Sequence, residues 1–245
     1  MPFPQDNPGF ESLPPSGAEE VRTTPQHGFR GDASQSRFAG EPASLTIALS
    51  REAGARGYSI GQRVGQKLGW PVYNQELLEY ISHEGLFRHN VAENLPGDSI
   101  RWADTQLEKL LQEQKISRHP SILDLARIVL ALGAKGEVVL IGRGAGCLLP
   151  TESTLHGRIM APLADRIAYF SQWLRLTLEE ATEQVRLRDN QRADFLSTHF
   201  HRDPKEMHQY DMLLNSSLLG EEVCAELVVK AAQAKMAGST FPAGD

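Results

Sequence analysis

The chain has 245 residues, of which 40% are hydrophobic and 23% are charged, and its formal net charge at pH 7 is -6. These values are typical of a globular protein with one large domain or two small ones. The acidic balance gives no general electrostatic reason to bind a nucleic acid polymer or an anionic membrane. No stretch approaches the roughly 18 apolar residues of a membrane span, and the N-terminus lacks the pattern of a signal peptide, so we expect a cytoplasmic protein.

Both ends of the chain differ in composition from its middle. Residues 1–43 are rich in proline, glycine, serine and glutamine and show no periodic apolar pattern. Such a segment cannot bury enough surface to offset its ordering entropy, which predicts a disordered tail, with a transient interaction motif as the alternative. Residues 238–245 are expected to form a flexible C-terminus. Cys147 and Cys224 lack metal-ligand spacing, which predicts reduced thiols in or near the core.

Between these ends, over residues 44–237, short apolar runs alternate with helical patterns. The runs of strand length are residues 45–49, 70–73, 138–142, 157–161 and 210–214. Ile60, Val64 and Leu68 recur every four residues and predict a helix, and Thr177 with Glu180 forms a capping-box pattern at the start of another. Alternating strands and helices favour an α/β fold with a parallel sheet covered by helices on both faces. Residues 75–135 are mostly helical and predict an added lobe.

The first strand run is followed by a glycine-bearing turn, SREAGARGYSIG (50–61). Gly54 and Gly57 supply permissive backbone, and Ser59 places a hydroxyl at the head of the next helix. Phosphate loops of the form G-x-x-x-x-G-K-[ST] also carry a lysine, which is absent here. On spacing alone, phosphate binding and a structural turn are equally open.

Four stretches favour phosphate binding over a structural turn, because they resemble motifs of one family and occur in the same order along the chain. They are residues 45–78, which contain the SRE turn and the LGWPVY run; VVLIGRGAGCLL (138–149); RIMAPLADRIAYF (158–170); and the region from RLRDNQRADFL (186–196) to residue 229. From residue 45 to about 229 the chain resembles the cytidylate kinase-like family of nucleoside monophosphate kinases.

The resemblance implies a P-loop NTPase-type fold: a parallel five-stranded sheet flanked by helices, with a helical acceptor-binding insert at about 75–135 and a lid at about 186–203. It also implies transfer of the ATP γ-phosphoryl group to a nucleoside monophosphate, with CMP as the acceptor and Mg²⁺ as the metal. Donor phosphates would be held by residues 54–59, which are Gly54, Ala55, Arg56, Gly57, Tyr58 and Ser59. Ser59 would bind Mg²⁺ through its hydroxyl.

The chain departs from the pattern of true cytidylate kinases at two places. Gly57 stands where their loop has lysine, and Gly144 stands where their GRD motif has aspartate. Arg56 is a candidate to supply the missing positive charge from a neighbouring position. The loss of the aspartate puts cytosine specificity in doubt.

Several arginines match positions of the family's motifs. Arg51 and Arg143 would contact substrate, whereas Arg188 and Arg192 would close over the reacting groups, with Asp189 orienting one of them. A surface loop arginine and a solvated charged helix face are the structural alternatives. Two further segments receive structural interpretations: Arg166 is expected to form an ion pair, and the pair His199 and His201 to share one face of a strand, too few for a metal site.

Three functional hypotheses follow from these motifs. The first is the nucleoside monophosphate kinase. The second is a non-catalytic nucleotide-binding or regulatory module that lost its lysine. The third is a kinase for another small acceptor, which the missing aspartate makes realistic. Neither the acceptor nor the oligomeric state follows from the sequence.

Overall fold

A computed structural model describes residues 42, 44–83 and 95–238. The predicted N-terminal tail, apart from Pro42, and the C-terminal segment after Gly238 lie outside the described residues. So do residues 84–94 of the predicted helical insert. Within the described part of the chain, no helix has the length and apolar character needed to cross a membrane.

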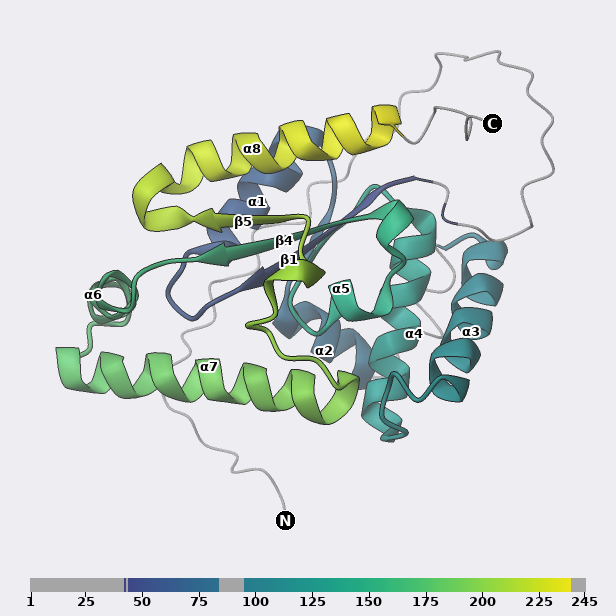
Figure 1. Cartoon of the computed structure of the whole chain (residues 1–245), viewed down its shortest axis with the longest axis horizontal. Helices are drawn as coiled ribbons and strands as arrows, with labels where there is room; N and C mark the ends of the chain where they lie inside the picture. The colour runs from purple at the N-terminus through teal and green to yellow at the C-terminus, as the bar shows by residue number, and fades with distance from the viewer. Residues whose placement is uncertain (1–41, 43, 84–94, 239–245) are drawn as a thin grey trace. The chain divides into compact units, whose positions relative to one another are not determined.

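The centre of the fold is a sheet of five parallel strands (Figure 1). The strands are β1 (Thr46–Arg51), β2 (Val72–Tyr73), β3 (Val139–Ile141), β4 (Thr154–Met160) and β5 (Met212–Asn215). Their spatial order is β2-β3-β1-β4-β5, so β1 is central, and its Ile47 pairs with Val139 on one side and Leu155 on the other. This architecture confirms the predicted α/β fold class. β4 begins earlier than predicted because Thr154 and Leu155 are also buried.

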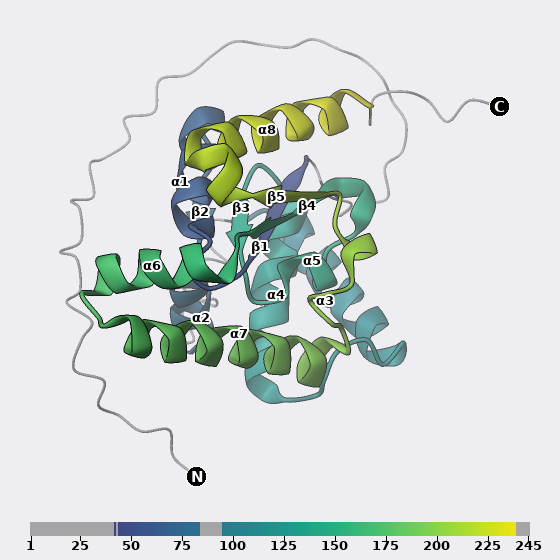
Figure 2. The same ribbon diagram turned by 60° about the vertical axis from the view of Figure 1, so that its left-hand side comes forward.

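Helices cover both faces of the sheet. One face carries α1 (Gly57–Leu68) and α8 (Ser216–Gly238), the latter interrupted at non-helical Gly220. The other face carries α4 (Pro120–Lys135) and the short α5 (Ala145–Leu148), with α2 (Gln75–His83) and α3 (Gly97–Gln112) packed on α4. Helices α6 (Leu163–Leu174) and α7 (Leu178–Phe200) follow β4 and lie side by side (Figures 1 and 2). Short 3-10 helices η2 (Thr151–Ser153) and η3 (Met207–Gln209) precede β4 and β5.

Successive side chains of β1 point to opposite faces of the sheet and contribute to two separate hydrophobic cores. Ile47 and Leu49 point to the α1 and α8 side, where they join a cluster with Ile60 and Val64. Ala48 points to the opposite side and joins the larger cluster that contains most of α4. Successive side chains of a strand point to opposite faces, which is why one strand serves both cores. The cysteines are free thiols, and burial raises the pKa of Cys147 to about 11.

Gly61 and Gly65 lie one turn apart on α1 and allow the helix to approach the sheet closely. A Cβ atom built on Gly61 would lie 2.5 Å from Cδ1 of Ile141, and one built on Gly65 would lie 2.8 Å from the carbonyl oxygen of Trp70 and overlap Val72. Gly69 ends the helix in the left-handed conformation with a φ of 71°. Gly61 and Gly65 are therefore packing positions, and Gly69 is the C-cap.

The segment around His199 and His201 was expected to be a strand, and this expectation is wrong. α7 continues through Phe200, with His201 as its left-handed C-cap at a φ of 53°. The helix starts with the predicted capping box, in which Glu180 N–H donates to Thr177 Oγ1 and Thr177 N–H donates to Glu180 Oε2. Two polar residues around one apolar residue fit the end of a helix as well as a strand, so the local pattern does not distinguish them.

We predict that Gly65→Ala destabilises the protein although alanine favours helices by about 1 kcal/mol over glycine. The added methyl group would press on the Trp70 carbonyl and on Val72, and overpacking of this kind costs about 1–3 kcal/mol. Urea unfolding measures the change. Gly97→Ala at the start of α3 is the matched control, because no atom lies within 4 Å of its Cβ position. A Gly65→Ala protein at least as stable as the wild type would contradict the packing explanation.

Candidate functional site

The candidate site lies at the carboxyl ends of the central strands. β1 ends at Arg51, and residues 142–144 follow the neighbouring strand β3. β2 and β3 lie on one side of β1, and β4 and β5 lie on the other, so the chain changes direction at β1. Open α/β sheets bind their ligands in the crevice at such a switch point.

The glycine loop, residues 52–56, turns sharply between β1 and α1. Gly54 has a φ of 80°, and a Cβ atom built on it would lie 2.6 Å from the carbonyl oxygen of Arg166. Arg56, the residue before α1, is also left-handed, with a φ of 59°. No side chain caps α1, and Ser59 Oγ donates back to the carbonyl oxygen of Arg56 at 3.0 Å. The first N–H groups of α1 therefore lack intrahelical acceptors, and with the helix dipole they favour an anion.

Asp189 of α7 contacts this loop directly. Its Oδ1 accepts a hydrogen bond from the backbone N–H of Ala53 at 2.7 Å, and its Oδ2 accepts one from Arg166 Nη1 at 2.5 Å. Arg166 is 8% exposed and also donates to the carbonyl oxygens of Ala53 at 3.1 Å and Ala161 at 3.0 Å. The ion pair predicted for Arg166 is therefore present, and it joins α6 and α7 to the loop.

Three arginines, Arg51, Arg143 and Arg192, converge beside the loop and are called the arginine cluster below. Burial, followed by repulsion from Arg192, lowers the pKa of Arg51 to about 9; Glu76 opposes this shift, and repulsion from Arg143 adds a smaller lowering effect. Burial is also the main reason that the pKa of Arg143 falls to about 10. Burial lowers the pKa of Arg192 as well, and Asp189 opposes that shift. All three remain cations at neutral pH, so like charges are held together.

The arginine cluster is supported by the insert and by α7. Arg51 Nη2 donates to Gln75 Oε1 at 3.2 Å, and Arg143 forms an ion pair with Glu79; both partners belong to α2. The guanidinium of Arg143 also lies over the Phe195 ring of α7, 4.7 Å from its centroid. α2 and α7 thus hold the cluster from two directions.

Two buried nitrogen atoms of the arginine cluster lack a hydrogen-bond partner in the described part of the chain. They are Nε of Arg143 and Nη1 of Arg192, and the latter lies 3.6 Å from Asp189 Oδ1, an ion-pair distance. A buried donor without an acceptor is costly, and a charged one more so. A phosphate has several acceptor oxygens and a negative charge, so it would satisfy these donors and reduce the repulsion among the arginines.

Two arginines proposed from the sequence point elsewhere. Arg188 lies over the Phe170 ring at 5.2 Å, between α7 and α6. Arg56 lies over Tyr169 at 5.0 Å and has its Nε 3.9 Å from Glu221 Oε1. The structure therefore brings together only part of the predicted set. Tyr58 is 52% exposed at the surface of α1.

Sequence reasoning missed Arg158, which lies in β4 beside the end of β1. Its Nη1 donates to Ser50 Oγ at 3.1 Å and to Tyr210 Oη at 3.3 Å, and its Nη2 lies 3.7 Å from Glu52 Oε1. A charged residue in the predicted strand run 157–161 was the available signal. The sequence also showed no sign of the α2 residues Gln75 and Glu79, which accept from Arg51 and Arg143, because polar residues are common on helix surfaces.

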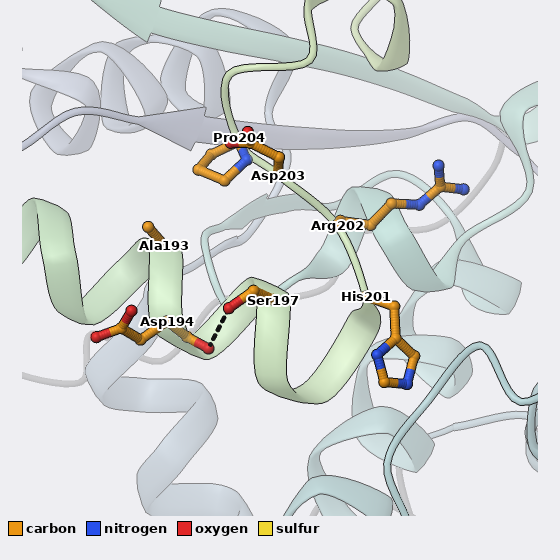
Figure 3. Close-up of a pocket in the computed structure, with 7 residues that line it drawn as sticks. All are labelled: Ala193, Asp194, Ser197, His201, Arg202, Asp203 and Pro204. Carbon is orange, nitrogen blue, oxygen red and sulfur yellow. Dashed lines mark hydrogen bonds between the residues drawn. The ribbon is translucent and has the colours of Figure 1, made fainter.

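A cavity of about 420 Å³ lies at the C-terminal end of α7 (Figure 3). It is lined by Ala193, Asp194, Ser197, His201, Arg202, Asp203 and Pro204, and in the helix Ser197 Oγ donates to the Asp194 carbonyl oxygen at 3.1 Å. Its lining belongs to the predicted lid and the residue after it. Neither the glycine loop nor the arginine cluster contributes to it, so it is separate from the candidate site.

Comparisons with known proteins bear on the family and the fold of the chain. The model of the Cytidylate kinase-like family matches residues 46–218. An uncharacterized protein from Eubacterium ventriosum has a similar fold, with a TM-score of 0.56 and 14% identity over 78% of this chain and 99% of that one. Shikimate kinase from Bacteroides thetaiotaomicron gives a TM-score of 0.42 and 15% identity over 78% of this chain and 96% of its own, too weak a likeness to support an argument.

One curated relative shares a shorter stretch. Uronate isomerase from Corynebacterium glutamicum is 30% identical over 104 residues, which are 42% of this chain. The chain spans 20% of the length of that relative. This match leaves most of the isomerase without a counterpart, so the isomerase activity is not carried over.

We predict that Arg166→Leu lowers the free energy of unfolding by about 3 kcal/mol, because it leaves the Asp189 carboxylate with only the longer ion pair to Arg192. The value is at the low end of such losses because the Asp189 side chain is 30% exposed. Urea unfolding measures it. Arg63→Ala, which removes an exposed ion pair with Glu222, is the control and should change stability by less than about 1 kcal/mol. Equal effects of the two substitutions would contradict the anchoring role of Arg166.

Proposed function

Since this chain belongs to the cytidylate kinase-like family, we propose that it transfers the γ-phosphoryl group of ATP to a nucleoside monophosphate. Family membership supports phosphoryl transfer of the kinase type in general, and the family name favours CMP as the acceptor. The convergence of Arg51, Arg143 and Arg192 beside the glycine loop is the observation that carries the proposal. Phosphoryl transfer mainly requires that two anions be positioned and that spreading charge be neutralised.

The donor phosphates would be bound by the glycine loop and the start of α1. The N–H of Ala53 is bonded to Asp189 and that of Ala55 to the Glu52 carbonyl oxygen, so the N–H groups of residues 54 and 56–59 would donate to the phosphates. The two unpartnered nitrogens of Arg143 and Arg192 fit a phosphate ligand. The phosphates of a nucleotide therefore suit the hydrogen-bond donors at this edge of the sheet.

Ser59 is the residue proposed to hold Mg²⁺. Its hydroxyl lies in the first turn of α1, and its bond to the Arg56 carbonyl leaves the oxygen lone pairs available. The described residues contain no cluster of three or more acidic, histidine or cysteine side chains that would bind a metal by themselves. A single hydroxyl suits Mg²⁺, which keeps several waters and takes further ligands from phosphates. When bound, Mg²⁺ supplies charge neutralisation on the phosphates.

The remaining residues would position the reacting groups. Arg143 would bind the monophosphate of the acceptor, and Arg192 would approach the transferred group from α7. Arg188 would join it only by leaving the Phe170 ring. Asp189 would orient Arg192, to which it forms an ion pair within the same helix. No covalent intermediate is needed for this chemistry.

Two observations each favour a different alternative function. Position 57 carries no lysine and the Asp189 carboxylate uses a loop N–H, which suits a non-catalytic nucleotide-binding module. A Cβ atom built on Gly144 would lie 2.5 Å from Cε2 of Phe200, so an aspartate cannot extend from this position unless Phe200 moves. This contact favours a kinase for a small acceptor other than CMP.

We predict that ADP is released with ATP and Mg²⁺ in the presence of one acceptor among CMP, dCMP, UMP and AMP, measured by a coupled assay. Arg192→Met should lower kcat about 10²- to 10³-fold, the loss typical of removing a group that stabilises transition-state charge. Ser59→Ala should also abolish most turnover because the metal ligand is lost.

Arg63→Ala, on the exposed side of α1, is the control and should keep wild-type turnover. If no acceptor is turned over while ATP binds by calorimetry, the kinase proposal fails and the nucleotide-binding module takes its place. Turnover that is unaffected by Arg192→Met would contradict the role given to the arginine cluster.

A further inference from the structure

The basic residue and a glycine have exchanged positions in this loop. In the pattern G-x-x-x-x-G-K-[ST] the first glycine stands six residues before the lysine. With the lysine position at 57, the first glycine corresponds to position 51. This chain has Arg51 at the glycine position and Gly57 at the lysine position.

The two positions are in contact, and only one of them can carry a side chain. A Cβ atom built on Gly57 would lie 2.6 Å from Cβ and 2.9 Å from Cγ of Arg51. Real Cβ atoms do not approach other atoms this closely. The aliphatic part of Arg51 therefore fills the space through which a lysine at position 57 would extend.

The path of the Arg51 side chain ends at the switch point of the sheet. A Cβ atom built on Gly142, at the end of β3, would overlap Nη1 of Arg51. The arginine thus extends from the side of Gly57 to the backbone after β3, and glycine at both positions leaves room for it. Its charged end lies in the arginine cluster, at the edge where the glycine loop also ends.

The guanidinium of Arg51 has few partners for a buried cation. Its hydrogen bond goes to the neutral amide of Gln75, at 3.2 Å. No carboxylate of the described residues lies within the 4.0 Å of an ion pair with it. Its charged neighbours are Arg192, Glu76 and Arg143, and the attraction of Glu76 is weaker than the repulsion from Arg192. Burying a cation among cations is unfavourable unless an anion joins them. Arg56, in contrast, already contacts Glu221 and Tyr169.

We infer that Arg51 supplies, from the end of β1, the positive charge that a lysine supplies from the start of the helix in ordinary phosphate loops, and that it binds the phosphates of the donor nucleotide. The inference rests on the proposed function in taking a nucleoside triphosphate as the ligand. Arg51, and not Arg56, then compensates for the absent lysine. A planar guanidinium offers paired donors to phosphate oxygens, which an ammonium group does not.

Calorimetry of ATP binding in the presence of Mg²⁺, with the full chain and no acceptor, tests the inference. Arg51→Met keeps much of the aliphatic packing against Gly57 and removes the charge, so ATP affinity should fall about 10- to 100-fold, the effect of losing a charge-assisted hydrogen bond. Arg51→Lys keeps a positive charge and should reduce ATP affinity less than Arg51→Met does. Arg63→Ala, which removes an exposed cation of α1, should bind ATP like the wild type.

Variants that exchange the residues at positions 51 and 57 test the inference more directly. Gly57→Lys alone should reduce ATP affinity and lower the melting temperature, because its Cβ meets Arg51. The double variant Arg51→Gly/Gly57→Lys conserves the net charge and opens the space, so its ATP affinity should exceed that of Arg51→Gly by about 10-fold or more. Thermal melts by circular dichroism show that each variant is folded.

Wild-type ATP affinity in Arg51→Met would overturn the inference, as would a double variant that binds no better than Arg51→Gly. These outcomes differ from failure of the proposed function. A wild-type chain that binds ATP through Arg51 but phosphorylates none of the four acceptors contradicts the kinase proposal and supports the inference. A chain that transfers phosphate as well in Arg51→Met as in the wild type supports the kinase proposal and overturns the inference.

Discussion

The hydrogen-bonded ion pair between Asp189 and Arg166 is the constraint on which the arrangement of the site depends. Asp189 accepts from Arg166 and from the N–H of Ala53, so one carboxylate fixes α7 against both α6 and the glycine loop. Arg192 follows three residues later in the same helix and is therefore held at the loop as well. Buried ion pairs add little net stability compared with apolar residues, but the loss of one partner is costly. Their contribution here is to fix one geometry for the loop and the helix.

That geometry concentrates positive charge at the carboxyl edge of the sheet. The central strand ends in Arg51, its neighbour β3 is followed by Arg143, and α7 brings Arg192 from the opposite side. Gln75 and Glu79 of α2 hold two of these side chains, but unpartnered nitrogen atoms remain on Arg143 and Arg192. Most of the positive charge at this edge therefore comes from the strand ends and α7, whereas position 57 at the start of α1 is glycine.

The sequence predicts the fold well because its signals are local. The five apolar runs, the capping box at Thr177 and the four-residue spacing of Ile60, Val64 and Leu68 each predict an element that the structure contains. The site is predicted only in part, because its geometry depends on contacts between distant segments. The sequence predicts Arg51 as a substrate-binding residue, but the passage of its side chain beside Gly57 and Gly142 depends on the packing of β1, β3 and α1 together. The strand expected at His199 and His201 fails because a short polar-apolar alternation also fits a helix end.

A crystal structure with magnesium and a non-hydrolysable ATP analogue tests the central claim most directly. We expect the analogue at the start of α1, with its phosphate oxygens within hydrogen-bond distance of loop N–H groups and of the Arg51 guanidinium. A nucleotide bound away from β1 and α1, or bound there with Arg51 directed away from the phosphates, would contradict the claim that the arginine cluster forms the phosphate site.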